Sequence, residues 1–199
     1  NVSNGLVISG WSNVVAGNLI GVDDDGRGRL GNGRHGMVAQ CSYTRIGDPA
    51  LGGNIIGGNG GHGLVLLGAG MSNSVQNNYI GVGRGGTGNV YNGLSGIFLT
   101  NWAGQVLIGG PGTNDANYIG HNGFYGICFD DASGGTTVRG NWIGLPPPGQ
   151  HFAPNEHGAI LMKELQSANY VVGNHLDGYV GVKLVHCWYQ WMEDNFIGL

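Results

Sequence analysis

Two neighbouring acidic residues, Asp130 and Asp131, are candidates for acid–base chemistry in this 199-residue chain. Enzymes that cleave glycosidic bonds place two carboxyl groups roughly 5 to 10 Å apart, on either side of the bond. Adjacent residues of a β-strand point to opposite faces of the sheet. If Asp130 and Asp131 share a strand, they cannot form such a pair, and the other acids are too scattered to supply one.

A run of three acidic residues, Asp23-Asp24-Asp25, is the densest group of oxygen ligands in the chain. Calcium ions bind to carboxylate and carbonyl oxygens, so this run is the one candidate Ca²⁺ site. It lacks the complete spacing of a calcium-binding loop, and the corresponding segments 82–92 and 145–155 contain no Asp. The alternative is a solvated turn, and no other cofactor is expected.

Two histidines, His35 and His62, fall in neighbouring repeats and could share a metal ion. The alternative, that both are turn residues, agrees with their place in the repeat, and no metal site is predicted. The three cysteines, Cys41, Cys128 and Cys187, lie in different repeats without C-x-x-C spacing. A disulfide needs Cα atoms within about 7 Å, so we expect three free thiols and no zinc site.

These side chains must be positioned by a repeat, because the sequence Asn-x-Ile-Gly recurs along the whole chain. The copies are Asn18-Leu19-Ile20-Gly21, Asn54-Ile55-Ile56-Gly57, Asn78-Tyr79-Ile80-Gly81, Asn117-Tyr118-Ile119-Gly120, Asn141-Trp142-Ile143-Gly144 and Asn195-Phe196-Ile197-Gly198, with a degenerate copy at Asn174-His175-Leu176-Asp177. Repetition on this scale indicates stacked supersecondary units. Stacking at about 4.8 Å would align the asparagines as a structural turn ladder, formed by Asn18, Asn54, Asn78, Asn117, Asn141, Asn174 and Asn195. The Ile of each copy should point inward as a core stack.

Each unit contains two further short apolar segments. One is a Gly followed by an apolar–x–apolar triplet, whose outward x is Val7, Val38, Val65, Phe98, Cys128, Ile160 or Lys183. The other centres on an apolar residue: Val15, Ile46, Val75, Ile108, Val138, Val171 or Met192. Short segments with period-two alternation predict strands. Because the order of segment types never reverses, each strand should stack on its like in the next unit.

This pattern resembles the right-handed parallel β-helix repeat, the pectate-lyase-like solenoid, and especially the Gly/Asn-rich repeats of bacterial secreted and surface proteins. A second signature, N-G-x-x-G, supports the resemblance at 32–36, 59–63, 92–96 and 122–126. The expected fold is all-β: a right-handed single-stranded parallel β-helix of about seven coils with three parallel sheets, in one domain over residues 1–199. The resemblance implies an extracellular or cell-surface location.

Hydrolases of this superfold provide a test for catalysis. Gly61-His62-Gly63 and Asp130-Asp131 resemble two short polygalacturonase motifs, but the Asn-Thr-Asp and Arg-Ile-Lys motifs are missing and the order is reversed. The repeat itself places His62 in one column with His35 and His157. We therefore expect no enzymatic activity.

Composition excludes some partners. Only 10% of residues are charged and the net charge is −4, which argues against nucleic acid because such partners require a basic footprint. No apolar run approaches the roughly 20 residues of a membrane span, so none is predicted.

The spacing of the motif asparagines alternates between long and short steps, so the period is a pair of coils. Three insertions of 11 residues, 22–32, 82–92 and 145–155, follow alternate motifs and should project from one edge. The chain stops where a fourth would begin and starts within a coil. Since solenoids need capped ends, we expect a segment of a longer array or subunits that stack end to end.

Apolar residues also occupy positions that should face outward. The x of Asn-x-Ile-Gly is Leu19, Ile55, Tyr79, Tyr118, Trp142, His175 or Phe196, and the candidate contact surface comprises Tyr79, Tyr118, Trp142, Phe196 and Phe98. Outward apolar columns mark contact sites, and amphipathic rings suit a protein interface or a sugar. The alternative is that these residues only stabilise the strands.

Two hypotheses follow. The first is a non-catalytic extracellular structural protein that self-associates, end to end or laterally, into a fibre or larger surface structure. The alternative is a carbohydrate-binding or polysaccharide-degrading lyase or hydrolase module, in which Tyr79, Tyr118 and Trp142 line a polysaccharide groove.

Overall fold

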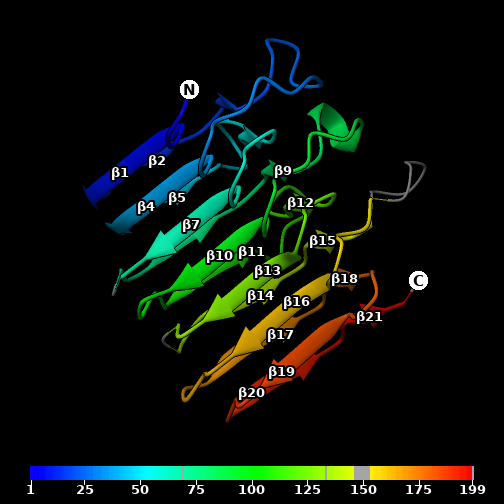
Figure 1. Cartoon of the computed structure of the whole chain (residues 1–199). Helices are drawn as coiled ribbons and strands as arrows, with labels where there is room; N and C mark the ends of the chain where they lie inside the picture. The colour runs from blue at the N-terminus through cyan, green and yellow to red at the C-terminus, as the bar shows by residue number, and fades with distance from the viewer. Residues whose placement is uncertain (69, 133, 146–152, 199) are drawn as a thin grey trace.

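The chain folds into a right-handed parallel β-helix of seven coils, as its repeats predict. The computed structural model describes residues 1–68, 70–132, 134–145 and 153–198. Each coil contributes one strand to each of three sheets, and every strand pairs in parallel with the equivalent strands of the neighbouring coils (Figure 1). The expected all-β fold with three parallel sheets is therefore confirmed.

The first sheet comprises β1 (Leu6–Trp11), β4 (Met37–Ser42), β7 (Leu64–Leu67), β10 (Ile97–Thr100), β13 (Tyr125–Asp130), β16 (Gly158–Lys163) and β19 (Val182–Val185). The second comprises β2 (Val14–Val15), β5 (Arg45–Ile46), β8 (Asn73–Val75), β11 (Val106–Gly109), β14 (Thr137–Arg139), β17 (Asn169–Val172) and β20 (Gln190–Glu193). The third comprises β3 (Leu19–Ile20), β6 (Ile55–Ile56), β9 (Tyr79–Ile80), β12 (Tyr118–Ile119), β15 (Trp142–Ile143), β18 (His175–Leu176) and β21 (Phe196–Ile197). A single short 3₁₀ helix among the described residues, η1 (Arg84–Gly86), lies in the second insertion.

The core runs along the axis of the coil as columns of like residues. Six of the predicted motif residues are buried there: Ile20, Ile56, Ile80, Ile119, Ile143 and Leu176. Ile197, in the last coil, is 56% exposed because no described coil lies beyond it. Consecutive strand residues alternate between this core and the outer surface, so a two-residue strand carries one core residue and one surface residue.

One strand is shifted by one residue from the sequence alignment. Ile127 pairs with Ile160, so Ala159 occupies the place that a glycine takes before the other strands of the first sheet. Ile160 therefore faces the core and is fully buried, and Leu161 takes the outward position, which corrects the prediction for Ile160. Alignment on Gly158 was misleading because the small residue directly before the core-facing position of this strand is Ala159.

The same shift separates His157 from the column of His35 and His62. The backbone N–H of His157 donates to the carbonyl of Phe124, the second residue after the asparagine of its signature. His35 and His62 are instead the third residues after theirs. The predicted three-histidine column is thus wrong and contains only two histidines.

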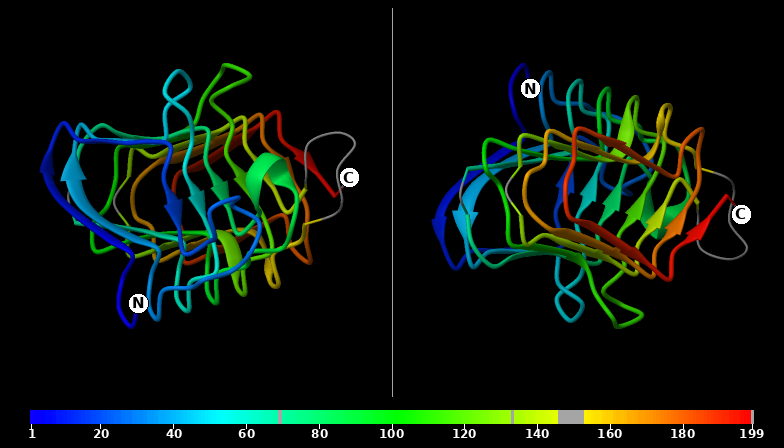
Figure 2. Two further views of the ribbon diagram at one scale, coloured as in Figure 1. Left: turned by 90° about the horizontal axis from the view of Figure 1, so that it is seen from above. Right: turned by 90° about the horizontal axis from the view of Figure 1, so that it is seen from below.

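The first two insertions, 22–32 and 82–92, project from the same side of the coil (Figure 1). Each closes on itself through an antiparallel bridge, Val22 with Arg29 and Val82 with Asn89. Residues 146–152 of the third predicted insertion lie outside the described residues. Two further loops, around 48–53 and 109–116, project from a different edge of the coil (Figure 2).

No helix in the described part of the chain is long and apolar enough to cross a membrane. The three cysteines are free thiols; Cys41 and Cys128 are buried and Cys187 is half-buried.

Candidate functional site

The seven motif asparagines form a continuous ladder at the turn before the third sheet. Each Nδ2 donates to the Oδ1 of the next asparagine, in six hydrogen bonds of 2.9 or 3.0 Å between Asn18 and Asn195. The same Oδ1 also accepts the backbone N–H of the preceding rung. The five central asparagines are fully buried.

The ladder satisfies polar groups that no water can reach. The second Nδ2 proton of Asn117, for example, is donated to the carbonyl of Val75 at 2.7 Å. The side-chain amide of each internal rung donates two hydrogen bonds through Nδ2 and accepts hydrogen bonds through Oδ1. A carboxylate has no donor and a hydroxyl has only one, so neither group could make all of these bonds. Asparagine is therefore required at each internal rung, and the ladder fixes the register of adjacent coils.

A second ladder of the same kind lies at the other end of the third-sheet strands. It comprises Asn32, Asn59, Asn92, Asn122 and Asn155, joined by side-chain hydrogen bonds of 2.7 to 3.0 Å. The N-G-x-x-G signature points to the first four rungs. Asn155 is followed by Glu156 rather than glycine, so the signature does not identify it.

The outward column of the third sheet carries stacked rings. Tyr79 stacks on Tyr118 at 5.1 Å between centroids, Trp142 on His175 at 3.9 Å, and His175 on Phe196 at 4.9 Å, all within 14° of parallel. All but Phe196 are half-buried. These contacts cover one ring face of Tyr79, Tyr118, Trp142 and Phe196 and both faces of His175, and no ring contact joins Tyr118 to Trp142 among the described residues.

Two hollows flank this column. One of about 350 Å³ lies beside Leu19, Ile55 and Tyr79 and is bordered by Arg84 of the second insertion. The other, of about 340 Å³, lies beside Tyr118, Trp142 and His175 and is bordered by the loop at 110–113. Neither hollow collects a set of acids and bases that could perform a reaction.

Phe98 lies apart from the other four predicted contact residues, on the outer face of the first sheet. It stacks on His62 at 4.4 Å, and His62 stacks on His35 at 5.2 Å. Nδ1 of His35 accepts the N–H of His62, and Nδ1 of His62 accepts the N–H of Ser95. These bonds occupy Nδ1 of each histidine and fix the two ring orientations. Burial, with the neighbouring His35, lowers the pKa of His62 to about 4.

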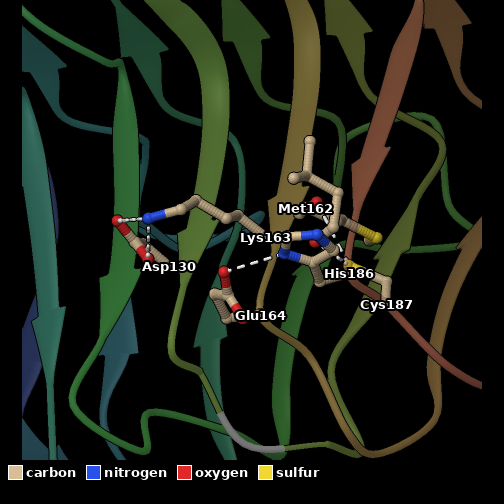
Figure 3. A network of polar contacts seen from close by, with 7 residues as sticks. Asp130, Met162, Lys163, Glu164, His186 and Cys187 are labelled. Carbon is tan, nitrogen blue, oxygen red and sulfur yellow. Dashed lines mark hydrogen bonds and ion pairs between the residues drawn. The ribbon is translucent and has the colours of Figure 1, made fainter.

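The polygalacturonase-like residues do not converge. His62 precedes β7, whereas Asp130 ends β13, two coils further along and at the opposite end of its strand. Asp130 instead pairs with Lys163 of the next coil, with Nζ 3.2 Å from one carboxylate oxygen (Figure 3). Asp131 lies beyond the strand with a φ of +55° and is exposed. Both acids thus belong to a corner of the coil, where Glu164 and His186 form a second pair at 3.1 Å.

The acidic run of the first insertion is held by its own backbone. Oδ1 of Asp23 and Oδ1 of Asp25 both accept the N–H of Arg27 at 2.9 Å. The backbone N–H groups of Gly28 and Arg27 lower the pKa of Asp23. No group of three or more His, Cys, Asp or Glu side chains suited to a metal ion occurs among the described residues. Calcium binding at Asp23, Asp24 and Asp25 stays a prediction.

Sequence reasoning missed an exposed apolar ridge along the corner between the first and second sheets. The ridge comprises Trp11, Tyr43, Met71 and Trp102, one from each of the first four coils, with side chains 46 to 80% exposed. Tyr43 and Trp102 have a positive φ, which turns the chain at this corner. In the next three coils the same corner carries the polar pairs Asp130–Lys163 and Glu164–His186 of Figure 3, and the last coil adds the exposed Trp188 and Tyr189. No periodic motif marks the ridge residues, so a pattern search passes over them.

No protein-family model matches the sequence, and comparisons with curated proteins and with solved structures give no match either. The assignment to the parallel β-helix fold therefore rests on the observed strand topology.

Proposed function

We propose that this protein is a non-catalytic structural component outside the cell, which self-associates laterally into a larger assembly. The observation that carries the proposal is the apolar ridge of Trp11, Tyr43, Met71 and Trp102. Contiguous exposed apolar side chains rimmed by polar ones mark protein contact sites, and Trp and Tyr are enriched in the centres of such sites. The extracellular location follows from the resemblance of the repeats to those of secreted and surface proteins.

The occupant that fits this ridge is a second copy of the chain. The corner is divided along its length: the first four coils carry the apolar ridge, and the next three carry Asp130, Lys163, Glu164 and His186, with Trp188 and Tyr189 also exposed in the last coil. Two parallel copies related by a two-fold axis along the coil would place ridge against ridge and let Lys163 meet a carboxylate of the partner copy. A two-fold contact of this kind is self-complementary, as a homodimeric interface must be.

The interior supports a mechanical rather than a chemical role. The motif asparagine ladder connects every coil to the next, and a second asparagine ladder and the ring contacts of the third sheet add further links, so the coil is stiff along its axis. Sugar binding at Tyr79, Tyr118 and Trp142 stays an untested alternative.

Light scattering after size-exclusion chromatography, with negative-stain microscopy of the same fractions, tests the proposal. We expect the mass to rise with protein concentration. Replacing the four ridge residues by serine should abolish this rise while the circular dichroism spectrum stays unchanged. A control chain carries serine at four exposed apolar positions elsewhere, Val2, Leu30, Leu51 and Tyr179, and should still associate.

A monomeric wild-type protein at every concentration would refute the assembly. So would equal association by the ridge variant and its control. The non-catalytic part is tested separately by incubation with pectin, polygalacturonate and other polysaccharides. Release of reducing ends or unsaturated products by the purified chain would contradict it.

A further inference from the structure

A polar pocket of about 330 Å³ lies between the second insertion and the segment that ends the third insertion and follows it. Asn89 and Tyr91 line it from one side, Pro154 and Glu156 from the other, and His121 lies between them. The pocket is separate from the corner ridge and from the stacked rings of the third sheet. It results from the two-coil period: the coil of His121 carries no insertion, so a gap opens between the loops on either side.

The same gap exists two coils earlier, with the same backbone pattern. There the N–H of Gly58 donates to the carbonyls of Val90 and Tyr91. Here the N–H of His121 donates to the carbonyls of Ala153 and Pro154. The two gaps are therefore equivalent positions of one repeat.

Three side chains of the later pocket replace glycines of the earlier gap. His121 stands in the place of Gly58, Glu156 in the place of Gly93, and Tyr91 in the place of Gly31, as the 11-residue insertions align them. A side chain at Gly93 would bring its Cβ to 2.3 Å from the carbonyl oxygen of Gly60, so glycine is the residue that stacking favours in that column.

His121 also departs from the backbone preference of its position. Its φ is +56°, whereas Gly58 reaches +77° without strain. A non-glycine residue in this region costs of order 1 kcal/mol or more, and such outliers cluster at functional sites. Three departures from glycine that converge on one hollow are not explained by the stability of the repeat.

The earlier gap is bridged by a contact that the later gap lacks. The guanidinium of Arg29 lies 3.5 Å from the centroid of the Tyr91 ring and bridges the first two insertions. A backbone contact between them, from the N–H of Arg84 to the carbonyl of Gly26, adds to the bridge. In the later gap the residues equivalent to Arg29 and Tyr91 are Asn89 and Pro154, so this cation–π contact has no counterpart there.

The side chains of the pocket indicate its ligand. Burial lowers the pKa of His121, so the imidazole is neutral near pH 7 and offers one donor and one acceptor. The carboxylate of Glu156 forms no ion pair with any described residue. Asn89 adds an amide and Tyr91 a ring and a hydroxyl. No cationic side chain is among the described lining residues, which disfavours phosphates and acidic sugars.

We propose that this pocket binds one neutral sugar unit, held by hydrogen bonds from His121, Glu156 and Asn89 to its hydroxyl groups and by contact with Tyr91. Vicinal hydroxyls donate and accept at close spacing, which matches a neutral imidazole beside a carboxylate and an amide. The volume lies at the low end of the range for small-molecule sites, which fits one ring rather than a chain. This proposal goes beyond the structural function and does not depend on it.

Saturation-transfer NMR on the full chain tests it, with the methyl glycosides of glucose, galactose, mannose and N-acetylglucosamine as probes. Galacturonate and argininamide serve as anionic and cationic comparators. We expect saturation of at least one neutral glycoside. His121→Gly and Glu156→Gly should each weaken its affinity about tenfold, the equivalent of one lost hydrogen bond. Both variants introduce the residue that the earlier gap already carries, so the fold should be retained.

Matched controls are available at the charged corner. His186→Gly removes a histidine with a φ of +51°, and Glu164→Gly removes a carboxylate with a φ of +58°; neither should alter binding. Three results would overturn the proposal: saturation of no neutral glycoside, saturation of galacturonate or argininamide alone, or unchanged affinity in both pocket variants. The ridge variants that disrupt assembly leave this pocket intact, so the two proposals fail independently.

Discussion

The buried asparagine ladder and the stacked outer column of the third sheet arise from adjacent residues of the same motif, yet they differ in tolerance. The ladder position is asparagine in all seven coils, whereas the outer position holds Leu19, Ile55, Tyr79, Tyr118, Trp142, His175 and Phe196. Both columns join neighbouring coils, although the ring contacts of the second are interrupted between Tyr118 and Trp142. The first does so through hydrogen bonds between fully buried groups, the second through contact between half-buried side chains.

This difference shows how environment determines the permitted residues. A buried rung must donate and accept in fixed directions, and an unmet group there costs about 1 to 3 kcal/mol. An outward ring needs only a neighbour of suitable shape, and a missing contact is replaced by water. The inner column therefore specifies register, whereas the outer column is free to vary. Four measurements test whether the two columns differ in this way.

The largest effect is expected when a carboxylate is placed at a core position of the third sheet, compared with the outward position next to it. Ile119→Asp introduces a carboxylate into the fully packed core and should cost more than about 4 kcal/mol, enough to unfold its coil. Tyr118→Asp, one residue away and facing outward, should cost less than about 2 kcal/mol. Urea denaturation followed by circular dichroism compares the two. Equal losses would show that both faces are equally buried.

The second effect concerns the ladder itself. Asn117→Ala removes the acceptor for two donors of Asn78 and the donor to Val75, so we expect a loss of about 3 kcal/mol. Asn18→Ala removes an exposed end rung and should cost less than about 1 kcal/mol. Thermal melts of the two variants provide the measurement. A loss at Asn117 no greater than at Asn18 would mean that water satisfies the broken rung.

A smaller effect is expected in the outer column. Trp142→Ala removes the ring that stacks on His175 at 3.9 Å and should lower the free energy of unfolding by about 2 kcal/mol. Trp142→Phe preserves a ring and should recover roughly half of that loss. The same urea titration reports both. An alanine variant more damaging than Asn117→Ala would reverse the proposed order of the two columns.

The smallest effect is a dependence on pH at the His35–His62–Phe98 stack, which combines a ring contact with a buried hydrogen bond. The folded-state pKa of His62 is about 4, below the 6.5 of an unperturbed histidine. The unfolded chain therefore binds the proton more readily, and stability should fall as the pH drops from 6.5 to 4, by about 1 to 2 kcal/mol after solvent screening.

Urea midpoints measured across this pH range provide the test for His62. His62→Gln should flatten the profile between pH 6.5 and 4, because glutamine does not titrate. If the slope persists in His62→Gln, another group causes it.

Much of the fold was predictable because each coil repeats its own short-range rules. The motif asparagines, the inward Ile column and the three strand types all follow from spacing. The prediction failed at Ile160, because spacing alone does not show that Ala159 rather than Gly158 occupies the small buried site before the strand. The predicted contact surface combined two outer faces, since Phe98 belongs to the first sheet and the other rings to the third.

The ridge and the pocket were not predictable from periodicity. Trp11, Tyr43, Met71 and Trp102 stand at corner positions that share no motif, and only the coil brings them into one line. His121 and Glu156 are 35 residues apart, and each merely looks like an irregular copy of the repeat. His121 and Glu156 line the same pocket because the coil of His121 carries no insertion whereas the coils on either side of it do.

The sequence by itself determined the parallel β-helix, because stacking requires the same small, apolar or amide residue at the same place in every coil. It also determined which positions are free to vary. Only the tertiary structure decided which of those free positions become neighbours, since residues one or two coils apart meet through the winding of the chain and the length of its loops. That geometry places the exposed apolar residues of the ridge at one corner. It also places His121, Glu156 and Tyr91, which replace glycines of the earlier gap, around one pocket.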